Sequence, residues 1–308
     1  MTGSGERRGL FVNAPSLPEV PAYLLCQTPW RGTWLSLRAA EREAVAEFPA
    51  ERFSFALCNL PKSLPETKRL LARAGSLAET VLAAAPNDSG GKRIPGLLRE
   101  AGVAFDKTGK AKCVLCRVEQ PGALANLDTG PDYFRGGHGF FTAPGIFGWD
   151  RIDEGSRLLV EHFPASFSGI GADFGCGYGY LTRAVLKRGS GLERLHAADA
   201  DARAVEAVRR NTAGRPEVSA HWLDLTEEEL PEKVDFVVMN PPFHQARALD
   251  FEVGPALIAK AAATLRPGGV LWMVANRHLP YEEPLRREFN AHDKLVETDG
   301  FKIFRAVK

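Results

Sequence analysis

Short apolar runs alternate with segments of helical spacing over the second half of this chain. The runs predict strands at 170–174, 194–198, 218–222, 234–239 and 269–274. Apolar residues recurring every three or four positions predict helices at 154–162, 181–188, 202–211, 254–265 and 284–290. Two last strands, 294–297 and 302–305, flank an Asp-Gly turn and predict a hairpin edge. This alternation is typical of a doubly wound α/β sheet, which binds ligands at the carboxyl ends of its strands.

The first half of the chain has a weaker pattern of the same kind. Strands are predicted at 53–58, 80–84 and 112–118, and helices at 36–48, 65–74 and 94–101. We therefore expect a smaller α/β domain over 1–120, a linker rich in Gly, Pro and Asp over 121–148, and a larger domain over 149–308. The linker carries Phe134, Phe140, Phe141 and Phe147, too many aromatic residues for a passive tether. We expect it to contribute to a site, with Phe147 near a cofactor.

A glycine-rich turn follows the first strand of the larger domain. Asp173 precedes Gly175, Cys176, Gly177 and Gly179, and a predicted helix begins directly after them. Glycines at alternate positions leave a bare backbone that a ligand can approach closely, so these five residues are candidate cofactor contacts. Dinucleotide-binding folds place the third glycine one residue later, and no Lys-Ser/Thr pair completes a P-loop.

Two further acids follow the next two strands. Asp199 is placed where a carboxylate would accept both hydroxyls of a ribose, and Asp224 where it would accept a hydrogen bond from an adenine amino group. Each acid, taken alone, also fits an exposed surface position or a helix cap. Their positions in the strand order favour ligand contact.

The fourth strand ends at a second motif, Asn240-Pro241-Pro242-Phe243. An exocyclic amine on a base is a poor nucleophile because its lone pair is delocalised into the ring. The Asn240 amide oxygen and the Pro241 carbonyl would accept the two amine hydrogens. Phe243 would stack on the base, an interaction that stabilises the bound base by about 1–3 kcal/mol. Catalysis would then be mainly positioning, and a base such as His244 is not required. A Pro-Pro turn ending a strand is the structural alternative.

The two motifs together resemble the class I S-adenosylmethionine-dependent methyltransferases. That resemblance implies a seven-stranded sheet with a reversed last strand, and S-adenosylmethionine as the cofactor. Residues 134–308 resemble more closely the guanine-N2 methyltransferases of ribosomal RNA, in particular the small-subunit enzyme and its large-subunit relative. The matching runs are Pro-Gly-Ile-Phe at 144–147, Asp-Glu-Gly-Ser-Arg-Leu-Leu at 153–159, Asn-Pro-Pro-Phe-His at 240–244, Ala-Asn-Arg-His-Leu-Pro-Tyr at 275–281 and Phe-Lys-Ile-Phe-Arg-Ala at 301–306.

In that family the N-terminal half is a second methyltransferase-like domain that has lost its cofactor site and helps to hold the RNA. Here Asn59-Leu60-Pro61-Lys62 follows a predicted strand, as Asn240 and its neighbours do, and no Asp-x-Gly-x-Gly occurs before residue 173. Both observations fit a degenerate duplicate. The resemblance thus implies ribosomal RNA, or a ribosomal subunit, as the partner.

Composition adds few constraints. The net charge is +1, and residues 1–140 carry 18 Lys and Arg against 14 Asp and Glu, an excess that suits a phosphate backbone or an ordinary solvated surface. No apolar run reaches the roughly 20 residues that cross a bilayer, and no apolar signal core opens the chain. The five cysteines include one isolated Cys-x-x-Cys, Cys113 to Cys116, which we interpret as part of a buried strand. We expect a cytoplasmic monomer without a bound metal.

Three other functions remain open at this point. The first keeps the methyl transfer but changes the acceptor from guanine to adenine N6 or a protein glutamine amide, because each is also a planar nitrogen that suits an Asn-Pro-Pro-aromatic motif. The second is a non-catalytic RNA-binding protein on the same scaffold. The intact glycines, acids and Asn240 argue against it, because a site that has lost its activity does not need them together. A nicotinamide dehydrogenase is disfavoured by the glycine spacing and by the lack of an evident proton donor.

Overall fold

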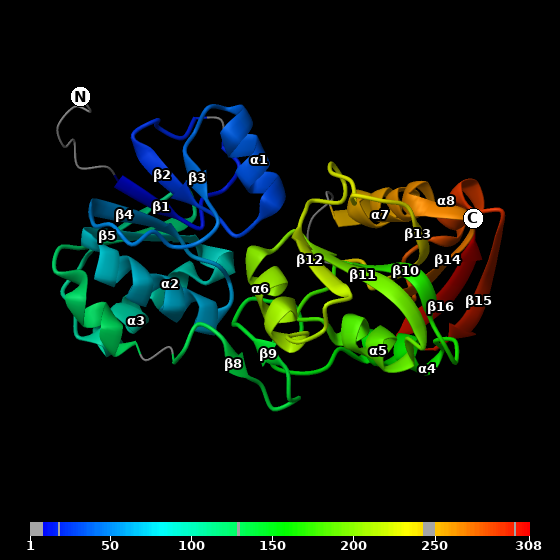
Figure 1. Ribbon diagram of the computed structural model, residues 1–308. Helices are drawn as coiled ribbons and strands as arrows, with labels where there is room; N and C mark the ends of the chain where they lie inside the picture. The colour runs from blue at the N-terminus through cyan, green and yellow to red at the C-terminus, as the bar shows by residue number, and fades with distance from the viewer. Residues whose placement is uncertain (1–8, 18, 128–129, 243–249, 299) are drawn as a thin grey trace, which may run out of the picture. The chain divides into compact units, whose positions relative to one another are not determined.

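The computed structural model describes residues 9–17, 19–127, 130–242, 250–298 and 300–308. The chain forms two compact units, Met1–Asp132 and Tyr133–Lys308 (Figure 1). This boundary falls inside the segment 121–148 that the sequence predicts as a linker. Each unit is described by itself below.

The C-terminal unit is built on one seven-stranded sheet with the order β12-β11-β10-β13-β14-β16-β15. All neighbours pair in parallel except β16, which is antiparallel to both β14 and β15. The doubly wound sheet with a reversed last strand is therefore confirmed. The strands are β10 (Ser168–Phe174), β11 (Gly191–Asp199), β12 (Val218–Trp222), β13 (Val234–Met239), β14 (Leu265–Asn276), β15 (Ala291–Glu297) and β16 (Phe301–Val307).

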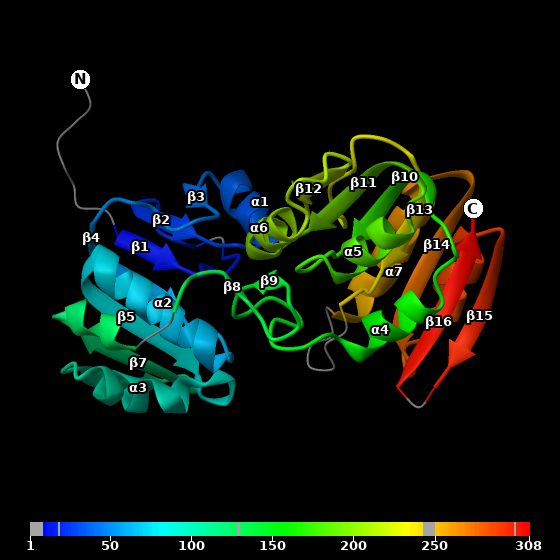
Figure 2. The same cartoon turned by 60° about the horizontal axis from the view of Figure 1, so that its bottom comes forward.

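Helices cover both faces of this sheet. One apolar cluster packs α7 and α8 on one face, and another packs α4 and α5 on the other, as Figure 2 shows from the side of α4 and α5. The two faces follow from the strand alternation: Ala198 belongs to the first cluster, whereas its neighbour Ala197 packs with Cys176 and Val208 of α6 on the opposite face. The helices are α4 (Glu154–Glu161), α5 (Tyr180–Arg188), α6 (Ala202–Asn211), α7 (Asp250–Thr264) and α8 (Glu282–Glu288).

A small hairpin, β8 (Phe134–Arg135) with β9 (Phe141–Thr142), opens the C-terminal unit. Asn211 at the end of α6 holds it in place. The amide oxygen of Asn211 accepts a hydrogen bond from the Phe141 main-chain N–H at 2.7 Å, and its amide nitrogen donates to the carbonyls of Phe141 and Tyr178, each at 2.7 Å. Part of the predicted linker therefore packs against α6, which follows β11, and α6 in turn contacts the turn that follows β10.

The N-terminal unit repeats the same architecture with its own seven-stranded sheet, in the order β3-β2-β1-β4-β5-β7-β6. Numbered along each unit, both sheets have the strand order 3-2-1-4-5-7-6, and in both only the seventh strand is antiparallel to its neighbours. The strands are β1 (Gly9–Val12), β2 (Leu24–Gln27), β3 (Ala44–Val45), β4 (Phe53–Asn59), β5 (Ala78–Pro86), β6 (Asp106–Lys110) and β7 (Cys113–Val118).

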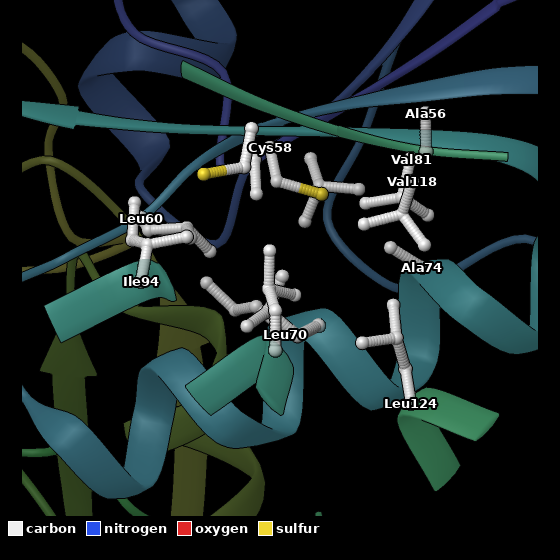
Figure 3. Close-up of a cluster of buried hydrophobic side chains, with 14 of the residues drawn as sticks. Ala56, Cys58, Leu60, Leu70, Ala74, Val81, Ile94, Val118 and Leu124 are labelled. Atoms are coloured by element: carbon white, nitrogen blue, oxygen red, sulfur yellow. The ribbon is translucent and has the colours of Figure 1, made fainter. Parts of the chain in front are cut away.

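The helices of this unit also lie on two faces. Helix α1 packs on one face, and α2 and α3 pack on the other around a core that includes Leu70, Ala74 and Ile94 (Figure 3). The helices are α1 (Arg31–Ala39), α2 (Leu64–Leu77) and α3 (Ile94–Ala101), with short 3-10 segments η1 (Asn87–Ser89), η2 (Gly91–Arg93) and η3 (Pro121–Asn126).

Two sequence predictions in this unit are wrong. The helix predicted at 36–48 is instead α1 followed by β3, because Glu41 takes a left-handed φ of 58° and the chain turns there to pair with β2. The cysteine pair is not buried as a whole: Cys113 is exposed and Cys116 is buried, since residues three apart on a strand point to opposite faces. Among the described residues, no helix has the length and apolarity to cross a bilayer.

Candidate active site

Strand register brings the predicted site residues to one edge of the C-terminal sheet. Phe174 of β10 pairs with Ala198 of β11 and with Met239 of β13. The next residue on each strand is therefore Gly175, Asp199 or Asn240, and these three lie at the carboxyl ends of adjacent parallel strands. Asp224 follows two residues after Trp222, which pairs with Asp199, so it belongs to the same edge.

The glycine turn uses its three glycines for two different purposes. Gly175, Gly177 and Gly179 have φ of 70°, 54° and 93°, values that residues with a Cβ rarely adopt. A Cβ at Gly175 or Gly177 would meet nothing within 4 Å, whereas one at Gly179 would lie 2.6 Å from the Val208 side chain. The first two glycines thus leave open space beside the backbone, and the third allows α5 and α6 to pack closely.

Asp199 ties the glycine turn to the end of β11. Its Oδ2 accepts a hydrogen bond from the Gly177 N–H at 2.8 Å, and its Oδ1 accepts one from the Asp201 N–H at 2.8 Å. Burial raises the pKa of Asp199 to about 6, and these backbone hydrogen bonds oppose the rise. Each oxygen keeps a second lone pair, so the carboxylate can still accept hydrogen bonds from a ligand.

Asp173 is fully buried beneath the same turn. Its Oδ2 accepts a hydrogen bond from the Thr182 hydroxyl at 2.6 Å, and its Oδ1 has no partner among the described residues. Burial raises the pKa of Asp173 to about 7, and the Thr182 hydrogen bond opposes that rise. A buried oxygen without a partner is uncommon in a folded protein and fits a site that a donor group of a ligand completes.

The other predicted cofactor contacts differ in their surroundings. Cys176 packs as a small apolar side chain against Ala197 and Val208, and this burial raises the pKa of its thiol well above the usual value. Phe147 is 54% exposed, next to Ile146, which is buried against Tyr178 of the glycine turn. Both side chains stay candidates for ligand contact.

Asp224 has a local role in its own turn. Its Oδ1 accepts hydrogen bonds from the Thr226 N–H at 3.0 Å and the Thr226 hydroxyl at 2.6 Å. No hydrogen bond to its Oδ2 is present among the described residues. The carboxylate therefore shapes the loop after β12 and keeps acceptor capacity for a ligand amino group.

Aromatic side chains of the segment before α4 cover the glycine turn. The His138 ring stacks on Tyr178 with centroids 4.9 Å apart, and Phe140 contacts the rings of Tyr178 and Tyr180 at 5.3 and 6.0 Å. The sequence indicated that this segment contributes to a site through its phenylalanines. It did not indicate His138, whose partner becomes apparent only in the folded unit.

Asn240 has a defined orientation at the end of β13. Its amide nitrogen donates to Asp153 Oδ2 at 2.9 Å and to Ser156 Oγ at 2.8 Å. Among the described residues, no hydrogen bond to its amide oxygen is present. Pro241 is buried and Pro242 exposed, while Phe243 and His244 lie outside the described residues. The sequence analysis did not assign Asp153 and Ser156 to the site, although both lie in the run at 153–159 that resembles the guanine-N2 methyltransferases and Asp153 has the spacing of an N-cap.

The raised pKa of Asp173 predicts a specific pH dependence of stability. A folded-state pKa near 7 against an unfolded value near 3.8 means that the folded protein holds this proton more tightly. The resulting stabilisation is present below about pH 4 and is lost as the pH rises through about 7. We expect Asp173→Asn to gain about 2 kcal/mol relative to the unsubstituted ligand-free protein between pH 5 and pH 8.

Urea unfolding of the ligand-free protein at both pH values measures this difference. Glu283→Gln, which changes an exposed carboxylate of α8, is the control and should show no relative gain. Equal pH dependence of stability for Asp173→Asn and the unsubstituted protein would contradict a raised pKa of Asp173 in the folded state.

Comparisons with known proteins show which family the chain belongs to. The sequence profile of the methyltransferase small domain family matches residues 137–305. Ribosomal RNA small subunit methyltransferase C of Stutzerimonas stutzeri is 34% identical over 84% of this chain and 81% of its own length. The protein of the same name from Pseudomonas aeruginosa strain LESB58 is 32% identical over 98% of this chain and 96% of its own. Further relatives of that name match over about half of their own length.

A solved structure shares the whole architecture. It is the Thermus thermophilus 16S rRNA N2 G1207 methyltransferase in complex with AdoMet and guanosine, with a TM-score of 0.79 and 23% identity, and the match covers 100% of this chain and 90% of that one. The likeness confirms the two-unit class I methyltransferase fold. The chain therefore belongs to the methyltransferase small domain family and, within it, to the relatives of ribosomal RNA small subunit methyltransferase C.

Proposed function

We propose that this protein transfers a methyl group from S-adenosylmethionine to the exocyclic N2 amine of a guanine in ribosomal RNA. One observation carries the proposal: the Asn240 carboxamide, at the strand end next to the glycine turn, has both N–H groups engaged and keeps its oxygen as an acceptor. An amine with two hydrogens is the complementary ligand. The relatives named for ribosomal RNA methylation, and the solved neighbour that holds guanosine, support guanine as the base.

The residues at the strand ends fit the cofactor. The open backbone at Gly175 and Gly177 and the unpartnered Asp173 oxygen suit its amino-acid part, and Asp199 suits the ribose hydroxyls. Asp224 keeps an oxygen for the adenine amino group, and Phe147 is an exposed aromatic ring beside the turn. The cofactor supplies an electrophilic methyl on a sulfonium. The protein contributes by holding the acceptor nitrogen in line with that methyl.

The chemical role of the second motif is to orient the amine. The Asn240 oxygen and the Pro241 carbonyl accept its two hydrogens, and the stiff Pro-Pro backbone keeps these acceptors at a constant spacing. Holding both hydrogens turns the nitrogen lone pair toward the methyl and favours tetrahedral character as the new bond forms. The proton becomes acidic once the nitrogen is alkylated and then leaves to water. Phe243 is proposed to stack on the base.

The N-terminal unit is proposed to have lost its own cofactor site. By register, Asn13, Thr28 and Asn59 take the places of Gly175, Asp199 and Asn240. The Asn13 N–H donates to the Gln27 side-chain oxygen at 3.1 Å, and the Asn13 and Asn59 amides donate to each other's main-chain carbonyls at 2.8 and 3.1 Å. No helix occurs among the described residues between β1 and β2, so the anion-attracting helix start that α5 provides is missing.

We propose that this unit holds the RNA. Helix α1 carries two guanidinium groups against one ring, Arg31 at 4.7 Å and Arg38 at 5.6 Å from the Trp34 centroid, and the neighbouring Trp30 is 44% exposed. Arginine planes and exposed aromatic rings together suit unpaired bases and phosphates. We further propose that the protein acts as a monomer on RNA or on a ribosomal subunit in the cytoplasm.

The substrate class is tested by incubating the protein with methyl-labelled S-adenosylmethionine and RNA from cells that lack it. We expect label in small-subunit RNA, recovered as N2-methylguanosine after digestion to nucleosides. The same incubation with DNA and with ribosomal and release-factor proteins is the control. Label recovered as N6-methyladenosine or in a protein glutamine would replace the guanine proposal, and no cofactor binding by calorimetry would end the enzymatic one.

Asn240→Ala is expected to lower single-turnover methylation by about 100-fold or more, because the amine loses the acceptor that orients it. Cofactor affinity by calorimetry should change less than about threefold, since the glycine turn and Asp199 are untouched. Asn290→Ala, an exposed position after α8, is the matched control. Unchanged turnover in Asn240→Ala would refute the role given to this residue.

Arg31→Gln with Arg38→Gln is expected to weaken RNA binding without changing cofactor affinity. Each lost phosphate contact should reduce the slope of log affinity against log salt by about 0.7–0.9. Filter binding at several salt concentrations measures this slope. Arg99→Gln on α3, which lies on the opposite face of the same sheet, is the control. An identical slope for the double variant would remove α1 from the proposed RNA surface.

A further inference from the structure

We infer that Asp153 and Ser156 are positioning residues that set the orientation of the Asn240 carboxamide for methyl transfer. The inference rests on the proposed function for the reaction class, but not on which base is methylated. Neither residue needs to touch the substrate or the cofactor. Their contribution is to decide which end of one side chain faces the acceptor amine.

The hydrogen bonds leave only one orientation for this amide. A carboxamide has two N–H donors, and here one goes to Asp153 Oδ2 at 2.9 Å and the other to Ser156 Oγ at 2.8 Å. The same Asp153 oxygen also accepts the Ser156 main-chain N–H at 2.8 Å, so it acts as an acceptor. Turning the amide by 180° would place its oxygen against that carboxylate oxygen and lose the hydrogen bond to Asp153, while the Ser156 hydroxyl would reverse its role and donate. The Asn240 oxygen is thereby left for an incoming N–H donor.

The two positioning residues are themselves held by the fold. Asp153 is the N-cap of α4, and its main-chain carbonyl accepts the Arg157 N–H at 3.0 Å. Between them, Gly155 allows the first turn of α4 to lie against the start of β16, because a Cβ there would be 2.8 Å from the Phe301 ring. Ser156 is 7% exposed. The site thus gains a rigid acceptor pair from an element that precedes β13 by more than seventy residues in the chain.

The N-terminal unit holds the corresponding asparagine by a different partner. Asn59 occupies the position of Asn240, and its amide nitrogen donates to the Asn13 main-chain carbonyl at 3.1 Å. The group that orients the amide at this strand end is therefore a main-chain carbonyl of the neighbouring strand end in one unit and the first turn of α4 in the other.

Removal of the Asp153 acceptor tests the inference. Asp153→Ala takes away the oxygen that fixes the amide, so we expect single-turnover methylation to fall about 10- to 100-fold with little change in cofactor affinity. Asp153→Asn keeps a side-chain oxygen that caps α4 and accepts from Asn240, so its rate should stay within about threefold of the unsubstituted protein. In Asn240→Ala the amide to be oriented is gone, so adding Asp153→Ala to that variant should lower the rate by less than about a further threefold.

Controls separate positioning from a structural role. Asp153→Ser keeps a capping side chain, so thermal midpoints of Asp153→Ser and Asp153→Asn should lie within a few degrees of the unsubstituted protein. Ser156→Ala should lower the methylation rate about two- to tenfold and leave cofactor affinity unchanged. If Asp153→Ala lowers the rate equally with and without the Asn240 side chain, or if Asp153→Ala has full activity, the inference is overturned. If the unsubstituted protein methylates another acceptor, the proposed function fails and the same variants are scored on that acceptor.

Discussion

The parallel register of three strands is the constraint on which the rest of the site depends. Because Phe174, Ala198 and Met239 pair side by side, the residues that follow them emerge together at one edge of the sheet. The three chemical components of the site, an open backbone, a carboxylate and a carboxamide, are therefore adjacent although more than sixty residues separate the first from the last. The Gly177 hydrogen bond to Asp199 then joins two of these strand ends directly. A shift of one residue in either pairing would turn one component to the opposite face of the sheet.

Two copies of one sheet topology in a single chain show what the site requires beyond the sheet. Both units have the same strand order, and both place an asparagine at the carboxyl end of the fourth strand. The C-terminal unit combines it with a glycine turn leading into α5, and with α4, a helix before the first strand that orients the amide; the described residues of the N-terminal unit include neither feature. In the N-terminal unit the corresponding amides of Asn13 and Asn59 are bonded to each other's backbone. The topology alone thus does not confer a site; the connections at the carboxyl edge do.

Burial determines the electrostatics of this edge. Asp173 and Asp199 both have raised pKa values because the sheet and helices exclude water from them, and nearby hydrogen bonds only partly compensate. Holding such acids in a folded protein lowers its stability near neutral pH. A ligand that supplies donor groups would recover that loss, which links cofactor binding to the stability of the C-terminal unit.

Much of the C-terminal unit could be predicted from the sequence, because its apolar runs and helical spacing are strong local signals, and its glycine turn and Asn-Pro-Pro-Phe motif mark the strand ends. The Asp-Gly turn predicted the terminal hairpin, and the family resemblance implied the reversed last strand. The helix predicted at 36–48 failed since a left-handed residue and an edge pairing, neither visible in periodicity, ended α1 early. The roles of Asp153 and Ser156 could not be predicted either. An Asp that caps a helix has the same sequence pattern whether or not it also accepts a hydrogen bond from a distant amide. By itself the sequence determined the alternation of strands and helices and placed the glycine turn and the Asn-Pro-Pro-Phe motif at strand ends; only tertiary packing, which places α4 against the end of β13, decided which way the Asn240 amide faces.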